Sequence, residues 1–311
     1  MNGCETAILI DDTNCGGCGR MCGAGLWCTA GVCRSVVGTW ATTGRLNVPR
    51  SLHTATLLAD GKVLIVGGDS GSGVALASAE VYDSVLRTFT PVRSAMSVQR
   101  RNHRAERLRD GRVVIIGGDN GAVANENFEV FNPGTNPVDG TFAFENRYPG
   151  LSECGVSLLP NGDLAITGGY RTGLGGGYCA GQTSRLAVGT TGSTVTSLST
   201  TGYAYTWMSL EVVVGGHAQV TTEQGNILIA GGGCGGWPMH GFIWEKARLL
   251  DSRSGIWGAD LTMNAQRLHF SMTALRDGDV LVAGGVDSAA LRSTERFQST
   301  GSTFMVGPDM A

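Results

Sequence analysis

A short motif that ends in two adjacent glycines occurs five times in this chain of 311 residues. In each copy, a tight turn such as "ADGK", "PNGD" or "RDGD" leads into a run rich in β-branched residues and then into the glycine pair. The pairs are separated by 50 to 63 residues, and their first members are Gly67, Gly117, Gly168, Gly231 and Gly284. Such a period indicates an array of equivalent structural units rather than one irregular domain.

The segments around each glycine pair have the character of β-strands. The Asp-Gly and Asn-Gly turns supply residues that adopt positive φ, as a two-residue hairpin loop requires. A further strand-like segment follows each pair, for example "SAEVYDS" or "STERFQS", and most units close with another such as "TFTPV". No helical periodicity persists along the chain. The sequence therefore predicts an all-β fold built from four-stranded units.

Four strands, a period near fifty residues and a double glycine resemble the Kelch repeat, which forms one blade of a β-propeller. The resemblance covers residues 36–311 and implies a Kelch-type β-propeller with at least five four-stranded blades. Residues 36–49 look like the outer strand of a closing or incomplete sixth blade, so either one blade has five strands or the chain continues beyond Ala311. The expected blades lie near residues 50–98, 99–148, 149–214, 215–265 and 266–311.

The amino-terminal segment, residues 1–35, differs from the rest in its cysteine content. An even number of closely spaced cysteines among glycines is typical of a small disulfide-bonded module. Zinc is the alternative, because "CGGCGRMC" has ligand-like spacing, although this segment has no histidine. The run resembles short modules at the front of secreted myxobacterial proteins, and we expect a secreted, extracellular or periplasmic protein. The six cysteines are Cys4, Cys15, Cys18, Cys22, Cys28 and Cys33.

The charge pattern limits the classes of partner. Charged residues make up 16% of the chain, the net charge is −3, and no run is rich in lysine or arginine. The longest apolar runs have the length of strands. We therefore expect no nucleic-acid partner and no membrane insertion. A small-molecule or glycan substrate and an unidentified protein partner remain open.

One position of the repeat carries side chains that commonly bind metals. Counting back fourteen residues from the first glycine of each pair gives His53, His103, Cys154 and His217; we call this set the column. In a Kelch blade this position begins the innermost strand, so the resemblance places the column near one mouth of the central channel. Imidazole with thiolate suits copper or zinc. The hypothesis is a copper ion, with zinc or no metal as alternatives, held by the three histidines. Histidine is also common here in Kelch repeats as a structural group that bonds to backbone.

Cys154 is the candidate catalytic residue, as a ligand or redox partner. Cys179 and Cys234 follow glycine pairs of adjacent units and are expected to form a disulfide, which leaves Cys154 as the odd thiol. A neighbouring cation or imidazolium would lower its pKa and favour the thiolate. The predicted pocket at the channel mouth is lined by Tyr205, Trp237, His240 and His269.

A second resemblance concerns the segment "ECGVSLLPNGDLAITGG". It resembles the blade of galactose oxidase that carries a cross-linked cysteine, and Cys154 matches that cysteine. In that family two tyrosines and two histidines hold copper, and one of the tyrosines is joined to the cysteine. Here Gly216 and His217 stand where the cross-linked tyrosine would be, so the tyrosyl-radical mechanism does not carry over.

Two functions are consistent with these patterns. The first is an exported metal-dependent oxidoreductase, with copper as the preferred metal, that acts on a small substrate at the channel mouth. The second is a non-catalytic binding or adhesion propeller that recognises a glycan, peptide or surface partner through its loops. The fold supports both, because propellers carry many unrelated functions.

Overall fold

The structure is a computed structural model that divides into two compact units, Met1–Thr43 and Gly44–Ala311. In the first unit, strands β1 (Leu26–Thr29) and β2 (Val32–Ser35) form a hairpin in which Cys28 pairs with Cys33 in the backbone register. Cys4, Cys15, Cys18 and Cys22 lie outside the described residues, so the disulfide-bonded module stays a prediction. The described residues are 26–29, 32–35, 43–71, 73–125, 127–147, 151–173, 176–179, 183–189, 192–198, 204–207, 210–213, 215–234, 242–275 and 277–310.

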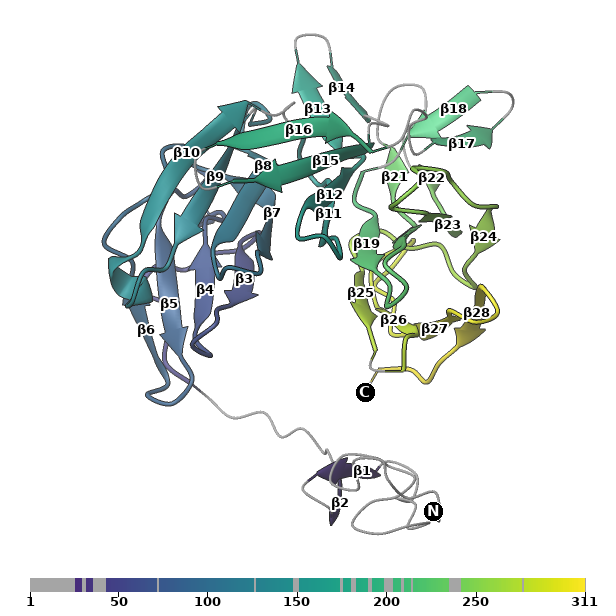
Figure 1. Cartoon of the computed structure of the whole chain (residues 1–311), viewed down its shortest axis with the longest axis horizontal. Helices are drawn as coiled ribbons and strands as arrows, with labels where there is room; N and C mark the ends of the chain where they lie inside the picture. The colour runs from purple at the N-terminus through teal and green to yellow at the C-terminus, as the bar shows by residue number, and fades with distance from the viewer. Residues whose placement is uncertain are drawn as a thin grey trace. The chain divides into compact units, whose positions relative to one another are not determined.

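The second unit consists of five four-stranded antiparallel sheets arranged in an arc (Figure 1). Sheets 1 and 2 contain β3 (Thr54–Leu57), β4 (Val63–Val66), β5 (Ala79–Asp83) and β6 (Thr88–Pro91), then β7 (Arg101–Arg107), β8 (Val113–Asp119), β9 (Asn127–Asn132) and β10 (Thr141–Arg147). Sheet 3 contains β11 (Gly155–Leu158), β12 (Leu164–Thr167), β15 (Thr183–Val188) and β16 (Ser193–Ser197). Sheets 4 and 5 contain β19 (Ala218–Thr221), β20 (Ile227–Ala230), β23 (Lys246–Leu250) and β24 (Leu261–Thr262), then β25 (Ser271–Ala274), β26 (Val280–Ala283), β27 (Thr294–Gln298) and β28 (Thr303–Val306). The all-β prediction is confirmed.

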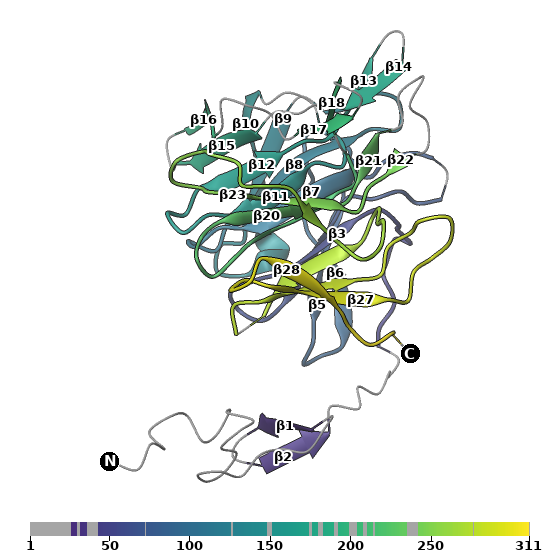
Figure 2. The same ribbon diagram turned by 90° about the vertical axis from the view of Figure 1, so that its right-hand side faces the viewer.

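The first strand of each sheet faces the centre of the arc. Contacts between neighbouring sheets run in the order β3, β7, β11, β19 and β25, so these inner strands line the inside of the arc, which we call the central channel. Three short hairpins gather on one side of the unit, as both views show (Figures 1 and 2). They are β13 (Tyr170–Gly173) with β14 (Gly176–Cys179), β17 (Ala204–Trp207) with β18 (Leu210–Val213), and β21 (Gly233–Cys234) with β22 (Phe242–Ile243). A 3₁₀ turn, η1 (Pro137–Asp139), precedes β10. Among the described residues, no helix is long and apolar enough to span a membrane.

The hydrophobic core lies between successive sheets, and the second strand of each sheet contributes to it on both faces. Because side chains alternate along a strand, Leu64 and Val66 of β4 pack with Val113 and Ile115 of β8. The next three interfaces repeat this arrangement. Leu281, the counterpart of Leu64 in sheet 5, is 37% exposed because no described sheet covers its face, whereas Leu64 is fully buried.

A buried ion pair stabilises three of the five sheets. Its arginine lies three residues before the column position. Its glutamate lies on the third strand of the sheet, beside the buried middle of the second strand. In each pair both side chains are at most 1% exposed. The pairs are Arg50–Glu80 (3.0 Å), Arg100–Glu129 (3.2 Å) and Arg267–Glu295 (3.1 Å).

Hydrogen bonds complete the environment of each pair, as sheet 1 illustrates. The Arg50 guanidinium donates to the carbonyl oxygen of Gly67 at 2.8 Å, and so ties the arginine to the glycine pair of its own sheet. The backbone N–H groups of Asn47 and Val48 donate to the Glu80 carboxylate at 2.8 and 3.1 Å. Burial alone would raise the pKa of Glu80, but these bonds and Arg50 hold that pKa below its usual value. The charges are therefore compensated on both sides.

Sheet 3 lacks the pair and shows why its two members occur together. Leu151 occupies the position of the arginine and is fully buried in an apolar cluster. Ser184, which pairs with Ile166 in the register, occupies the position of the glutamate. A single replacement would leave one buried charge without its partner, which costs far more than removing both.

We expect Glu129→Gln to destabilise the protein by about 3–5 kcal/mol, because Arg100 then remains buried without its counter-charge. The comparable change at the exposed pair Arg93–Asp139, Asp139→Asn, is expected to cost less than about 1 kcal/mol. The free energy of unfolding in urea measures both. The double variant Arg100→Leu, Glu129→Ser reproduces the arrangement of sheet 3 and should be more stable than Glu129→Ser alone. Equal stability of these last two variants would contradict the argument.

Candidate functional site in the central channel

Five residues in the left-handed backbone conformation form a belt at one end of the channel. Each directly precedes a column position. The N–H groups of the last four donate to the carbonyl oxygen of the belt residue in the preceding sheet, at 3.0–3.2 Å. Only one of the five is glycine, although this conformation is unfavourable for other residues. The belt was not predicted from the sequence, because its residue types share no pattern. It comprises Leu52 (φ 55°), Asn102 (φ 54°), Glu153 (φ 56°), Gly216 (φ 65°) and His269 (φ 53°).

The column side chains point sideways into the preceding sheet. His103 Nε2 lies 2.9 Å from Thr54 Oγ1 of sheet 1, and its Cε1 would lie 2.8 Å from a Cβ placed on Gly67. His217 Nε2 lies 2.9 Å from Thr167 Oγ1 of sheet 3. The column therefore belongs to the joints between sheets.

This geometry corrects the hypothesis of a shared metal site. His53, His103, Cys154 and His217 each occupy a different position around the arc, and His53 is exposed. Among the described residues, no group of three or more histidine, cysteine, aspartate and glutamate side chains could hold a metal ion. The side chains that were expected to ligate copper are separated because His103, Cys154 and His217 each fill the joint between their own sheet and the preceding one.

Cys154 is not the reactive thiolate that the sequence suggested. Its side chain is 1% exposed within the apolar cluster that contains Leu151 and Ile116. Burial raises the pKa of the Cys154 thiol to about 11, although the nearby Arg104 acts in the opposite direction. It is a free cysteine and a neutral core residue at neutral pH.

The remaining predicted site residues are only partly described. His269 is exposed at the belt, where a Cβ on Gly216 would lie 3.2 Å from its Cε1 and 3.4 Å from Glu153 Oε2. The Leu268 side chain lies nearer still, 2.6 Å from that position, so the space beside Gly216 is filled. Trp237 and His240 lie outside the described residues, as do the side chains of Tyr205, Cys179 and Cys234, which lie in β17, β14 and β21. The predicted disulfide and that part of the pocket stay predictions.

Below the belt, the channel contains a cavity of about 260 Å³ bounded by β7, β11, β19 and β25. Its walls combine charged, polar and apolar side chains from four successive sheets. Those that matter most for recognition are Arg104, Glu106, Val156, Gln219, Phe270 and Ser271.

A hydrogen-bond network fixes the protonation of His217 at one wall of this cavity. Gln219 Nε2 donates to the carbonyl oxygen of Ala165 at 3.1 Å, which identifies the other end of the amide as the oxygen. Thr167 Oγ1 donates to that oxygen, so the same hydroxyl can only accept from His217 Nε2. The imidazole therefore carries a proton on Nε2 and is committed to the joint between sheets 3 and 4.

Glu106 is the titratable group of the cavity. Burial raises its pKa to about 7, against the opposing effect of Arg107. No described residue forms a hydrogen bond with its carboxyl group. A carboxyl group that titrates near neutral pH in a cavity is a recognised feature of binding and catalytic sites. The sequence signal was the pair Arg104 and Glu106, two charges on one face of a predicted innermost strand.

Comparisons with known proteins identify the fold. The model of the Kelch motif matches residues 50–96. Among solved structures, 415 chains match; one is the structure of YjhT, with a TM-score of 0.65, 13% sequence identity, and 84% of each chain covered. No curated protein matches the chain. The described sheets and this likeness establish a Kelch-type β-propeller, and at this identity the likeness extends to the fold alone.

We expect the Cys154 thiol to resist alkylation until the protein unfolds, because both burial and the raised pKa suppress the reactive thiolate. Iodoacetamide labelling of the native protein at about pH 8, read by mass spectrometry of the peptide that contains Cys154, measures this. The same protein in denaturant is the control and should be fully labelled. Rapid labelling of the native protein would restore Cys154 as a candidate reactive residue.

His103 and Glu106 are expected to affect stability in opposite directions on acidification. Burial lowers the pKa of His103 from 6.5 to about 3, so below pH 6.5 the unfolded chain binds its proton first and stability falls. The pKa of Glu106 is raised from 4.5 to about 7, so the folded protein binds its proton first and stability rises as the pH drops towards 4.5. Each effect amounts to at most about 1.4 kcal/mol per pH unit.

Single variants separate the two effects between pH 4.5 and 6.5, where both operate. Relative to the unmodified protein, Glu106→Gln should lose more stability on acidification, and His103→Gln should lose less. Urea unfolding across this range provides the measurement. Parallel pH profiles for all three proteins would show that neither group is buried as described.

Proposed function

We propose that this protein is a binding propeller that accepts a small hydroxylated ligand, of the size of a sugar unit, in its central channel. The observation that carries the proposal is the Glu106 carboxyl group, which lies in the cavity with a pKa near 7 and no described hydrogen-bond partner. A ligand that bonds to this carboxyl group would compensate for the cost of its burial.

The composition of the cavity wall supports a saccharide-like ligand. A sugar ring presents apolar C–H faces and hydroxyl groups at its edges. Phe270, Met272 and Val156 offer apolar surface, whereas Glu106 and Ser271 offer hydrogen-bonding groups. Binding sites commonly combine apolar walls with a few polar groups that fix orientation.

The alternative, a metal-dependent oxidoreductase, is not favoured by an observation in the described residues. His103 and His217 form hydrogen bonds in the joints between sheets, and Cys154 is a neutral core thiol. The proposed binding function uses only side chains that take no part in the joints between sheets. It also agrees with the range of functions that propellers perform with one architecture.

We expect neutral mono- and disaccharides to include at least one that binds with measurable heat in isothermal titration calorimetry. Affinity should increase as the pH rises through 7, because an ionised Glu106 accepts stronger hydrogen bonds from hydroxyl groups. Glu106→Gln should weaken binding by about tenfold or more and abolish this pH dependence.

Glu223→Gln, a change of an exposed acid outside the cavity, is the matched control and should leave binding unchanged. Binding that is identical in Glu106→Gln would place the ligand elsewhere on the protein. Absence of heat with every sugar, at pH values well below and well above 7, would contradict a saccharide-binding channel.

A further inference from the structure

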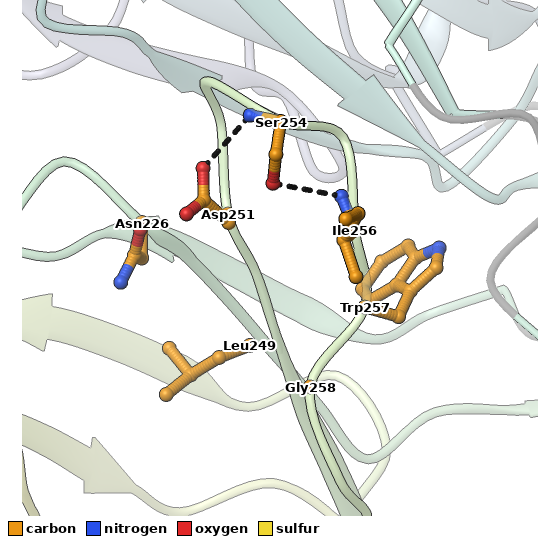
Figure 3. Close-up of a pocket in the computed structure, with 7 residues that line it drawn as sticks. All are labelled: Asn226, Leu249, Asp251, Ser254, Ile256, Trp257 and Gly258. Carbon is orange, nitrogen blue, oxygen red and sulfur yellow. Dashed lines mark hydrogen bonds between the residues drawn. The ribbon is translucent and has the colours of Figure 1, made fainter.

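A second cavity, of about 380 Å³, lies at the outer part of sheet 4 (Figure 3). It opens between β23 and the segment that leads to β24, far along the sheet from the channel-lining strand β19. Leu249 and Ile256 provide apolar walls, and Ile256 is 66% exposed. Asn226, Asp251 and Ser254 provide a polar rim. This combination of apolar walls and one carboxylate is independent of the proposed channel site.

Two local features accompany the cavity in sheet 4. The first is Asn226, the residue before the second strand. Its counterpart in sheet 1, Lys62, extends to Asp60 at 2.8 Å, and its counterpart in sheet 2, Arg112, donates to the carbonyl oxygen of Val188 at 3.1 Å. Asn226 is short, as are its counterparts Asp163 and Asp279 in sheets 3 and 5, and it lines the cavity.

The second feature is the outermost strand. In sheet 1 the outermost strand β6 pairs with β5 over four residues, from Glu80↔Pro91 to Asp83↔Thr88. In sheet 4 the strand β24 contains two residues, and the chain ahead of it is held to β23 at Gly258, whose N–H group donates to Leu249 at 2.8 Å. The wall of the cavity, from Ile256 to Gly258, lies ahead of β24 and pairs with the end of β23 through the bridge between Leu250 and Trp257.

Asp251 supplies a fixed negative charge at the rim. Its Oδ1 accepts hydrogen bonds from the N–H groups of Arg253 at 2.8 Å and Ser254 at 2.9 Å. These backbone bonds lower the pKa of Asp251, so the carboxylate is ionised at neutral pH. No described residue donates to the second oxygen, Oδ2, which lies on the side of Asn226 in Figure 3.

Two nearby arginines are directed elsewhere. Arg248 forms an ion pair with Asp260, and Arg253 lines a separate cavity together with Pro160 and Asn161. Arg253 also acts on Asp251 electrostatically and lowers its pKa, but the guanidinium lines the other cavity. The ligand that complements the carboxylate at this rim is a cation.

We infer that this cavity binds a lysine side chain of a partner polypeptide. The aliphatic stem of lysine matches the walls formed by Leu249 and Ile256, and its ammonium group matches Asp251 Oδ2, with Asn226 as a second acceptor. A free sugar or an anion would leave the carboxylate uncompensated. Lysine combines an apolar stem with a compact terminal charge, and the cavity combines apolar walls with a carboxylate that complements this charge.

The test uses Nα-acetyl-lysine methylamide as the probe, with its Nε-acetylated form and the norleucine analogue as uncharged comparisons. We expect NMR titration to shift the indole resonance of Trp257, assigned with Trp257→Phe, and to give weaker binding of both uncharged analogues. Asp251→Asn should weaken binding of the lysine probe by about threefold to fivefold, as befits an exposed ion pair.

Asp83→Asn is the matched control, because Asp83 forms the same turn in sheet 1, accepting from Val85 and Leu86 at 2.9 and 3.0 Å. It should leave binding unchanged. Asn226→Lys supplies a lysine from the chain itself, as sheet 1 does, and should block the probe without altering the Asp251 turn. Equal binding of charged and uncharged probes, or equal effects of Asp251→Asn and Asp83→Asn, would overturn the inference. Neither result bears on Glu106, so the channel proposal is tested separately.

Discussion

The close approach of adjacent sheets at the glycine pairs is the constraint on which the rest of this structure depends. The N–H group of Gly68 donates to the carbonyl oxygen of Arg100 in the next sheet at 2.9 Å, and Gly118 and Gly232 make the same bond to Leu151 and Arg267. A Cβ on Gly67 would lie 2.5 Å from that Arg100 oxygen, and the residue has a φ of 63°. Both the space and the backbone conformation therefore require glycine.

The same approach explains the chemistry of the column. The space above the first glycine of one sheet is filled by the column residue of the next. His103 lies against Gly67, and Cys154 lies against Gly117. Either histidine or cysteine fills this space, provided that the facing residue is small enough to leave room for it. Gly155 is the adaptation opposite His217, since a Cβ there would lie 2.6 Å from its Nε2. Residues that resemble metal ligands thus recur for a packing reason.

The architecture was predictable from the sequence because its determinants are local. A double glycine, a preceding Asp-Gly turn and a fixed period specify the sheet and its neighbours without further information. In the structure each inner strand begins within two residues of its column position. The direction of the column side chains was not predictable, because it depends on the carbonyl groups of another sheet some fifty residues away. The raised pKa of Glu106 was missed for the same reason: burial by β11, β19 and β25 is not visible in the segment "RAER".

The groups that the framework does not use are the ones to examine for function. Arg50, Glu80 and their equivalents are held in ion pairs and hydrogen bonds, and sheet 3 shows that the framework dispenses with such a pair when both members change together. Glu106 has no such compensation. Ser157, its counterpart in sheet 3, carries no charge and is satisfied by Gln219 and Thr221. The fold therefore does not require an acid on an inner strand, and a half-buried acid without a partner lowers stability above its pKa. Sheet 2 therefore accepts a loss of stability at Glu106 that sheet 3 avoids at Ser157. We attribute Glu106 to the binding of a ligand and not to a requirement of the fold.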